Sequence, residues 1–206
     1  MTTKSSTGLL TVAIAAGVVA VVTLGAARAV TTVERLLGQG DGTEVLGTGD
    51  DQVPIASSTD SIAKQCTVPQ MLVDNRCGDV PVLVVNAARM PFIARNTKLA
   101  WEDGQPGILT MNRSKQDANR RNACPESFPR SHGGQCDEYP MASTNEGGRG
   151  AHTEEVPARE NRCQGGSYNS QYPKDGQQFL VVISSPDLIA TDAYAGTDIA
   201  KVQGYC

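Results

Sequence analysis

The sequence is poor in aromatic residues: its 206 residues include three Phe, one Trp and five Tyr. A hydrophobic core built from this composition is aliphatic and modest in size, so the fold needs a further source of stability. The scarcity also leaves no evident aromatic platform for a sugar. A glycoside hydrolase that uses two carboxylates is therefore kept only as an alternative function.

Two missing motifs exclude or disfavour other classes of protein. No Cys-x-x-Cys spacing occurs, which disfavours a structural zinc site. No GxxxxGK[ST] pattern occurs, which excludes a phosphate-binding P-loop.

Charge is absent from Gly8 to Ala27, and the small-x-small pattern Ala27-Arg28-Ala29 follows. This order predicts a signal peptide over residues 1–29 and a secreted, extracellular protein. Because the run approaches the ~20 residues that span a bilayer, a single N-terminal membrane anchor with the domain outside is the alternative. A buried core helix is the least compatible interpretation, because the run has no polar face.

An even number of cysteines in an exported chain predicts a disulfide framework. All six lie beyond the charge-free run. We expect the two sequence-local pairs to form, with Cys163 left to hold the C-terminal Cys206; the local pairs are Cys66–Cys77 and Cys124–Cys136. Each bridge would contribute about 2 to 4 kcal/mol, mainly by restricting the unfolded chain.

Residues 30–65 are rich in Gly, Thr, Ser and Asp and carry few large apolar side chains. Such a segment buries too little surface to offset the entropy of ordering, so we predict a low-complexity acidic linker or propeptide. The folded domain is then expected over residues 66–206. Its middle part is nearly neutral with local basic clusters, which is compatible with an anionic substrate.

Short apolar runs predict strands, and they are Val80–Asn86, Ile108–Met111, Ala151–Val156 and Phe179–Ile183. A helix is expected over Phe92–Trp101, and a second one after an N-cap at Ser114. The segment 157–168, which contains Gly165-Gly166, is expected to be a loop. Without regular βαβ repetition, these elements indicate a small α+β domain built on an antiparallel sheet.

The motif CDEYPMASTNEGG, residues 136–148, places three carboxylates near a Pro and a Gly-Gly pair. A surface Asp-Glu pair is usually only solvated. Carboxylates are also the groups that hold Mg²⁺ against a phosphate, and Mg²⁺ needs only one or two of them. Adjacent residues of a strand point to opposite faces, so Asp137 and Glu138 reach one ion only if the chain bends, for example at Pro140.

The order of several motifs resembles the NucA/NucB deoxyribonuclease family over about residues 92–183. The motifs are Asp103-Gly-x-Pro106, Thr110-x-x-Arg113, Arg120-Arg121, Asp137-Glu-Tyr-Pro-Met-Ala142, Glu146-Gly-Gly148, Glu160-Asn-Arg162, Gly166-Ser-Tyr168 and Tyr172-Pro-x-Asp-Gly176. The resemblance implies a secreted bacterial endonuclease that hydrolyses DNA with a divalent metal, Mg²⁺ or Mn²⁺, and little sequence preference.

Candidate site residues follow from the motifs and the resemblance together. The catalytic candidates are Asp137, Glu138, Glu146 and His132, with Asp137 and Glu146 as the metal ligands. The candidates for gripping the substrate are Arg113, Arg120, Arg121 and Asn161, because Arg offers phosphate bidentate hydrogen bonds. The bacillus-type members of the family carry His where this chain has Gln105, so that imidazole cannot be the base here.

DNA is the expected substrate, and RNA is kept as a second one. A protein inhibitor and a monomeric state are further expectations. The alternative that is not an enzyme is a disulfide-stabilised extracellular binding domain that keeps the scaffold without the chemistry.

Overall fold

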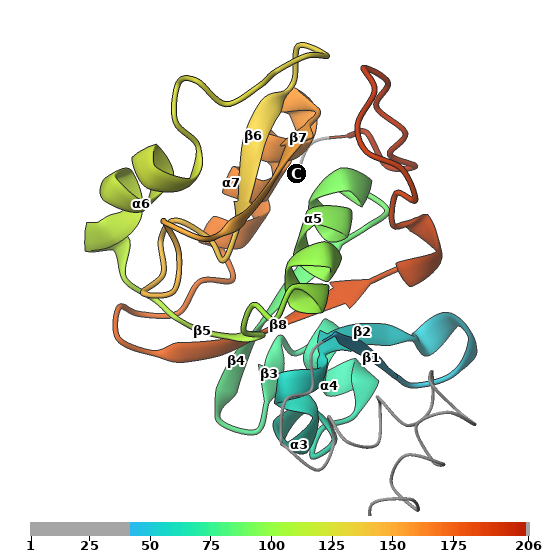
Figure 1. The fold of residues 1–206 in the computed structure, drawn as a ribbon. Coiled ribbons are helices and arrows are strands. Elements are labelled where there is room, and N and C mark those ends of the chain that lie inside the picture. The colour runs from blue at the N-terminus through green and yellow to red at the C-terminus, as the bar shows by residue number, and fades with distance from the viewer. Residues whose placement is uncertain (1–41, 205–206) are drawn as a thin grey trace, which may run out of the picture. The chain divides into compact units, whose positions relative to one another are not determined.

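The computed structural model describes residues 42–204, and Figure 1 shows their fold. The predicted signal peptide or anchor lies outside this range, as do Cys206 and the first part of the predicted linker. In the described range, no helix is long and apolar enough to cross a membrane. The α+β class is confirmed, because helices combine with two small sheets.

A mixed sheet forms the centre of the domain. Its central strand β8 (Gln178–Ser184) runs parallel to β4 (Val80–Asn86) and antiparallel to both β2 (Val53–Ala56) and β5 (Ile108–Thr110). The outer strands are β1 (Thr43–Leu46), which pairs with β2, and β3 (Arg76–Cys77), which pairs with β4. The sheet differs from the expected antiparallel one in the β4–β8 pair, where a long connection returns the chain to the same end of the sheet.

Strand β8 is buried on both faces. Phe179, Val181 and Ile183 belong to the larger hydrophobic cluster, whereas Leu180 and Val182 belong to a second cluster on the opposite face. Successive side chains of a strand alternate between faces, so a strand covered on both sides is apolar throughout. The apolar run in the sequence reflects this double burial, and the predicted strand is confirmed.

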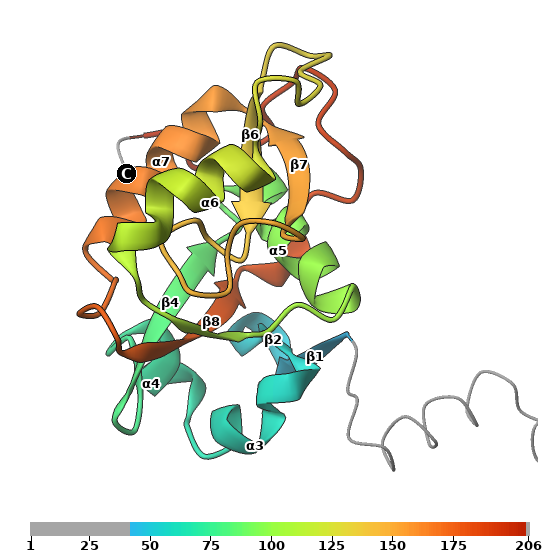
Figure 2. The same cartoon turned by 60° about the vertical axis from the view of Figure 1, so that its left-hand side comes forward.

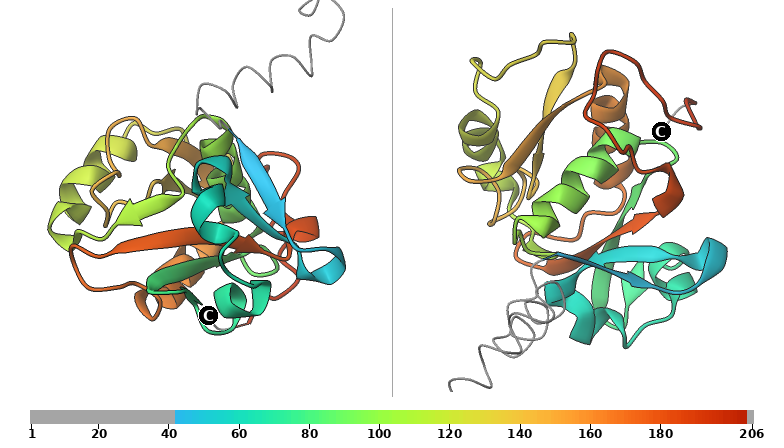
Figure 3. Two further views of the ribbon diagram at one scale, coloured as in Figure 1. Left: turned by 90° about the horizontal axis from the view of Figure 1, so that it is seen from below. Right: turned by 45° about the vertical axis from the view of Figure 1, so that its right-hand side comes forward.

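Helix α5 (Pro91–Glu102) covers the first face of the main sheet and buries Phe92, Ile93 and Trp101. On its other side lies the second sheet, in which β6 (Gln135–Tyr139) pairs antiparallel with β7 (His152–Val156). The right-hand view of Figure 3 shows α5 between the two sheets. The predicted helix and the predicted strand before Pro157 are thus confirmed.

Two further helices flank β6, as Figure 2 shows. They are α6 (Gln116–Ala123) and α7 (Ala158–Asn169). A 3-10 turn over Arg113–Lys115 precedes α6, so the helix begins after Lys115 rather than at the Ser114 N-cap that was expected. Other 3-10 turns occupy Gly49–Asp51, Ser57–Thr59 and Pro186–Leu188.

The second face of the main sheet is covered by α3 (Asp60–Ala63) and α4 (Val68–Leu72). Ala63 and Met71 from these helices pack with Val53 and Ile55 of β2 in the second hydrophobic cluster. This part of the chain therefore closes a face of the sheet that would otherwise be exposed.

The linker prediction for residues 30–65 is wrong over residues 43–65, and the folded domain starts before residue 66. Strands β1 and β2 form a hairpin in this segment, and Val53 and Ile55 have no exposed surface. The segment has few apolar residues, but Val53 and Ile55 lie on the second face of the main sheet and are covered by α3 and α4. Composition averages over a segment and does not show where each side chain will lie.

The loop predicted for residues 157–168 is also wrong, because α7 covers it. The helix buries Glu160, Cys163 and Tyr168 along one side. Glu160 Oε2 accepts the backbone N–H groups of Phe92 at 3.0 Å and Ile93 at 3.1 Å. These are first-turn donors of α5, which have no partner within their own helix. Tertiary contacts therefore stabilise a helix that its Gly-Gly pair disfavours.

The two local disulfides are confirmed, with Cα–Cα distances of 5.3 Å for Cys66–Cys77 and 5.8 Å for Cys124–Cys136. The first joins the turn after α3 to β3, and the second joins the end of α6 to β6. Cys163 is disulfide-bonded as well, and the pairing expected with Cys206 involves a residue outside the described range.

Candidate active site

A pocket of about 280 Å³ lies among α6, α7 and β6. Three arginines, Arg113, Arg120 and Arg162, line it together with the carboxylate of Glu138. Most of the other polar lining consists of side-chain amides. Guanidinium groups bind phosphates through paired, charge-assisted hydrogen bonds, so this pocket can receive a phosphate next to a carboxylate.

Glu138 is the acidic group of the pocket and is 6% exposed. Its Oε1 lies 3.5 Å from Arg120 Nε, and its carboxylate accepts the backbone N–H of Ala142. Its Oε2 lies 3.2 Å from Cys124 Sγ, which is a disulfide sulfur and has no hydrogen to donate. Burial raises the pKa of Glu138, and Arg120 opposes that rise. The carboxylate thus keeps acceptor positions for a further ligand.

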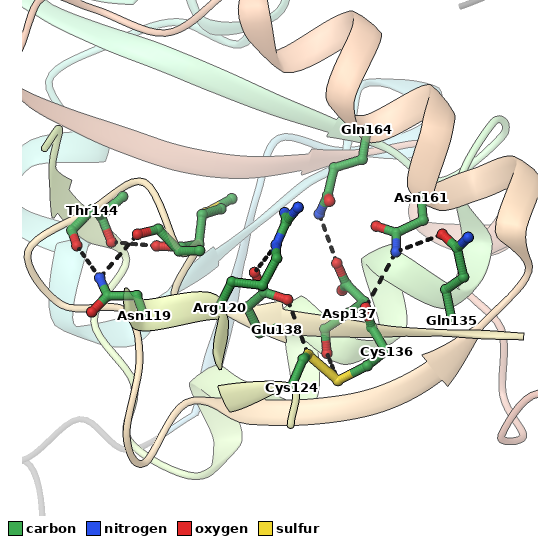
Figure 4. Close-up of polar contacts among 12 residues, drawn as sticks. Asn119, Arg120, Cys124, Gln135, Cys136, Asp137, Glu138, Thr144, Asn161 and Gln164 are labelled. Atoms are coloured by element: carbon green, nitrogen blue, oxygen red, sulfur yellow. Dashed lines mark hydrogen bonds and ion pairs between the residues drawn. A yellow bond between two sulfur atoms is a disulfide. The ribbon is translucent and has the colours of Figure 1, made fainter. Parts of the chain in front are cut away.

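Asp137 precedes Glu138 on β6 and is 2% exposed. Its Oδ2 accepts a hydrogen bond from Asn96 at 2.7 Å, and its Oδ1 accepts one from Gln164 at 2.8 Å. Burial, followed by the charge of Glu138, raises the pKa of Asp137 to about 7. Gln164 lines the pocket, and Figure 4 shows it reaching from α7 to Asp137. Asp137 therefore lies behind the pocket wall.

The donor set of the pocket fits a hydrated divalent cation. Between residues 42 and 204, no three His, Cys, Asp or Glu side chains gather as a metal-binding group. Mg²⁺, however, keeps several waters and takes only one or two protein carboxylates. Glu138 supplies one carboxylate, and Asn161 and Gln135, which line the same pocket, each carry an amide oxygen, of which Gln135 Oε1 already accepts a hydrogen bond from Asn161 Nδ2.

Glu146 does not line the pocket. Its Oε2 accepts the backbone N–H of Thr110 at 2.9 Å, which ties the loop after β6 to β5. A Cβ atom at Gly147 would lie 2.3 Å from the backbone oxygen of Met141. Gly148 has a φ of +100°, and a Cβ there would lie 2.6 Å from Asn119 Oδ1. The Glu-Gly-Gly part of the motif therefore shapes the loop, and the hydrogen-bond partner of Glu146 is Thr110, whereas those of Asp137 are Asn96 and Gln164.

Some of the other predicted site residues line the pocket, and others do not. Arg113, Arg120 and Asn161 line the pocket, whereas Arg121 and His132 do not. The backbone N–H of His132 donates to Glu155, and its ring meets Tyr194 edge-on at 6.2 Å. His132 thus lies outside the pocket.

The sequence interpretation missed Arg162 and Gln164, because it took their segment for a loop. On a helix, residues three, four and seven positions apart share a face. Asn161, Gln164, Gly165 and Tyr168 follow this spacing, and all four line the pocket. This helical spacing is present in the sequence, but the Gly-Gly pair favoured the interpretation as a loop.

The part of the chain that builds this pocket is similar to known proteins. Residues 93–182 match the family model described as Deoxyribonuclease NucA/NucB. A protein described as a DNA-entry nuclease, from Bacillus subtilis (strain 168), is 34% identical over 98 residues. The matched region covers 46% of this chain and 65% of that relative, which is less than two thirds of its length.

The segment that matches the NucA/NucB model, residues 93–182 and called the NucA/NucB segment below, begins in α5 and ends in β8. It contains every residue that lines the pocket and both carboxylates of β6. Strands β1 to β4 and helices α3 and α4 lie before it. The match therefore covers the pocket and not the part of the domain that closes the second face of the sheet.

Proposed function

We propose that this chain is an extracellular nuclease that hydrolyses DNA, cuts within the strand with little sequence preference and uses Mg²⁺ or Mn²⁺. The observation that supports this function is the set of three arginines that line the pocket of the NucA/NucB segment together with Glu138. The name of the Bacillus subtilis relative points the same way.

The pocket residues suit the charge of a phosphodiester. Arg113, Arg120 and Arg162 would hold the non-bridging oxygens of a phosphate. Contacts with phosphates position a nucleic acid but carry no sequence information. Binding that depends on them is therefore nonspecific and weakens steeply as salt rises.

Glu138 would hold the divalent cation, together with amide oxygens of the pocket such as that of Asn161. When bound, such a cation supplies charge neutralisation at the phosphate and an activated water. Asp137, behind Gln164, has a pKa near neutrality and can hold or release a proton under working conditions. We assign Asp137 to proton transfer and Glu138 to the cation.

A plasmid-nicking assay tests the proposal. Oxidised protein comprising residues 30–206 should convert supercoiled plasmid to nicked circles in Mg²⁺ or Mn²⁺ and lose this activity in EDTA. Arg162→Ala should raise the KM for DNA about tenfold, the equivalent of one lost charge-assisted contact. Arg121→Ala is the matched control, because Arg121 lies on the neighbouring helix outside the pocket lining, and its KM should stay within about twofold.

Two outcomes would contradict the proposal. Absence of cleavage by disulfide-bonded protein in both metals would favour the binding-domain alternative. Equal cleavage with and without EDTA would remove the metal from the mechanism. Replacing the plasmid by RNA in the same assay tests the second expected substrate.

The Cys124–Cys136 bridge should matter more for activity than the other bridge. It joins α6, which carries Arg120, to β6, which carries Glu138, and Figure 4 shows it beside that carboxylate. A misplacement of pocket groups by about 1 Å can cost about 100-fold in rate. We expect the double variant Cys124→Ser/Cys136→Ser to lose about 10- to 100-fold in cleavage rate.

The double variant Cys66→Ser/Cys77→Ser is the control. The two bridges span similar sequence separations, 11 and 12 residues, so their removal relaxes the unfolded chain by a similar amount. Cleavage rates are compared at a temperature where both variants are folded by circular dichroism. Equal losses in the two variants would show that the bridge near the pocket has no special role.

A further inference from the structure

A line of polar side chains leads from the surface to Asp137. His152 Nε2 lies 3.4 Å from Asp103 Oδ2, and His152 Nδ1 lies 2.6 Å from Asn96 Oδ1. Asn96 Nδ2 in turn donates to Asp137 Oδ2 at 2.7 Å. Asn96 has no exposed surface, and the side chain of His152 is 22% exposed. None of Asp103, His152 and Asn96 lines the pocket.

The amide of Asn96 has a defined direction in this line. An ionised carboxylate only accepts hydrogen bonds, so Asp137 requires the Nδ2 end of the amide. The Oδ1 end then faces His152, whose Nδ1 must carry the hydrogen that it accepts. If the amide turned over, its oxygen would face the Asp137 carboxylate, and two acceptors would meet in a buried place.

His152 is itself held in position from two sides. In the β6–β7 sheet it lies opposite Tyr139, two residues beyond Asp137. The Asp103 carboxylate lies 3.4 Å from Nε2 on one side of the ring, and Nδ1 faces α5 and Asn96 on the other. The histidine therefore orients an amide that in turn holds a carboxylate.

We propose that His152 is a positioning residue of the nuclease, which acts through Asn96 to hold Asp137 in its working orientation. This inference rests on the proposed function, because it assigns a positioning partner to one of the two β6 carboxylates of the candidate site. His152 does not touch the pocket, so its effect should fall on the turnover of bound DNA and not on the binding of DNA. Such outer partners of reacting groups typically change activity by about 10- to 100-fold.

Two substitutions at His152 separate orientation from mere packing. His152→Ala removes the donor, and we expect kcat for plasmid nicking by the chain of residues 30–206 to fall about tenfold with KM unchanged. The side-chain amide nitrogen of an Asn reaches about the same place as the Nδ1 atom of a His. His152→Asn should therefore restore the hydrogen bond to Asn96 and bring kcat to within about threefold of the unsubstituted protein.

A double variant tests the route through Asp137. In an Asp137→Asn background, His152→Ala should cause no further loss, because the group that His152 positions has already been removed. Thermal unfolding of each variant verifies that the loss of kcat occurs in folded protein.

Three results would overturn the inference while leaving the proposed function standing. They are an unchanged kcat in folded His152→Ala, a His152→Asn variant that is as slow as His152→Ala, and an equal tenfold loss in the Asp137→Asn background. Absence of cleavage by the unsubstituted protein would instead overturn the proposed function and this inference with it.

Discussion

Asp137→Asn is expected to lower kcat for DNA cleavage by about 100-fold or more while leaving the protein folded. The substitution keeps the shape of a side chain that is 2% exposed and removes its capacity for charge. Its two partners are amides, and the amide of Gln164 can turn over to accept from the new N–H group. The loss should appear in single-turnover nicking at saturating DNA, with KM nearly unchanged.

Asp137→Asn should lower the activity without lowering the stability of the fold above neutral pH. Burial raises the pKa of Asp137 from 3.8 to about 7. The stabilisation linked to its protonated form is therefore complete below the pKa of the unfolded chain and is lost as pH rises through about 7. Asp137→Asn lacks this loss, so at pH 8 the variant should be at least as stable as the unsubstituted protein.

Thermal unfolding in EDTA at pH 5 and pH 8 measures this difference. Asp187→Asn, at an exposed position in a 3-10 turn, is the control and should change neither activity nor the pH dependence of the melting temperature. An Asp137→Asn protein that is unfolded at both pH values would show that the carboxylate is needed for folding, and the assignment to proton transfer would then lose its support.

Ile55→Ala should lower the free energy of unfolding by about 2 to 5 kcal/mol. Ile55 has no exposed surface and packs in the cluster on the second face of the main sheet. Its strand pairs with β8 at Val182, so the cavity would open beside the central strand of the domain. Chemical denaturation of oxidised protein measures the change.

Val45→Ala in the same hairpin is the matched control. Val45 is 53% exposed, and an exposed substitution usually changes stability by less than about 0.5 kcal/mol. If Ile55→Ala cost no more than Val45→Ala, the segment 43–65 would be dispensable for folding, as a linker is.

Strands β4, β5 and β8 of the main sheet were predictable, and so was the helix after Pro91. Val80–Asn86 and Phe179–Ile183 are continuous apolar runs because both faces of the sheet are covered, and such runs signal a buried strand directly. Helix α5 follows a Pro at its first turn and presents apolar residues at helical spacing. In these elements, local pattern and final environment agree.

Helix α7 and the hairpin of β1 and β2 were not predictable, because distant parts of the chain stabilise them. Helix α7 depends on the buried contacts of Glu160 with the backbone of α5, 67 and 68 residues earlier in sequence. Strand β2 depends on its pairing with β8, which the chain reaches only near its end. Neither contact can be inferred from residues that are neighbours in the sequence.

The sequence by itself determined the α+β class, the two local disulfides and the likeness to the NucA/NucB family, because these depend on residue type, short spacing and motif order. Only the tertiary structure decided which charged groups meet. Asp137 and Glu138 are neighbours in sequence, yet one lies buried behind Gln164 and the other lines a pocket with three arginines. The strand turns alternate side chains to opposite faces, and the helices packed on each face decide whether a carboxylate meets amides or guanidinium groups.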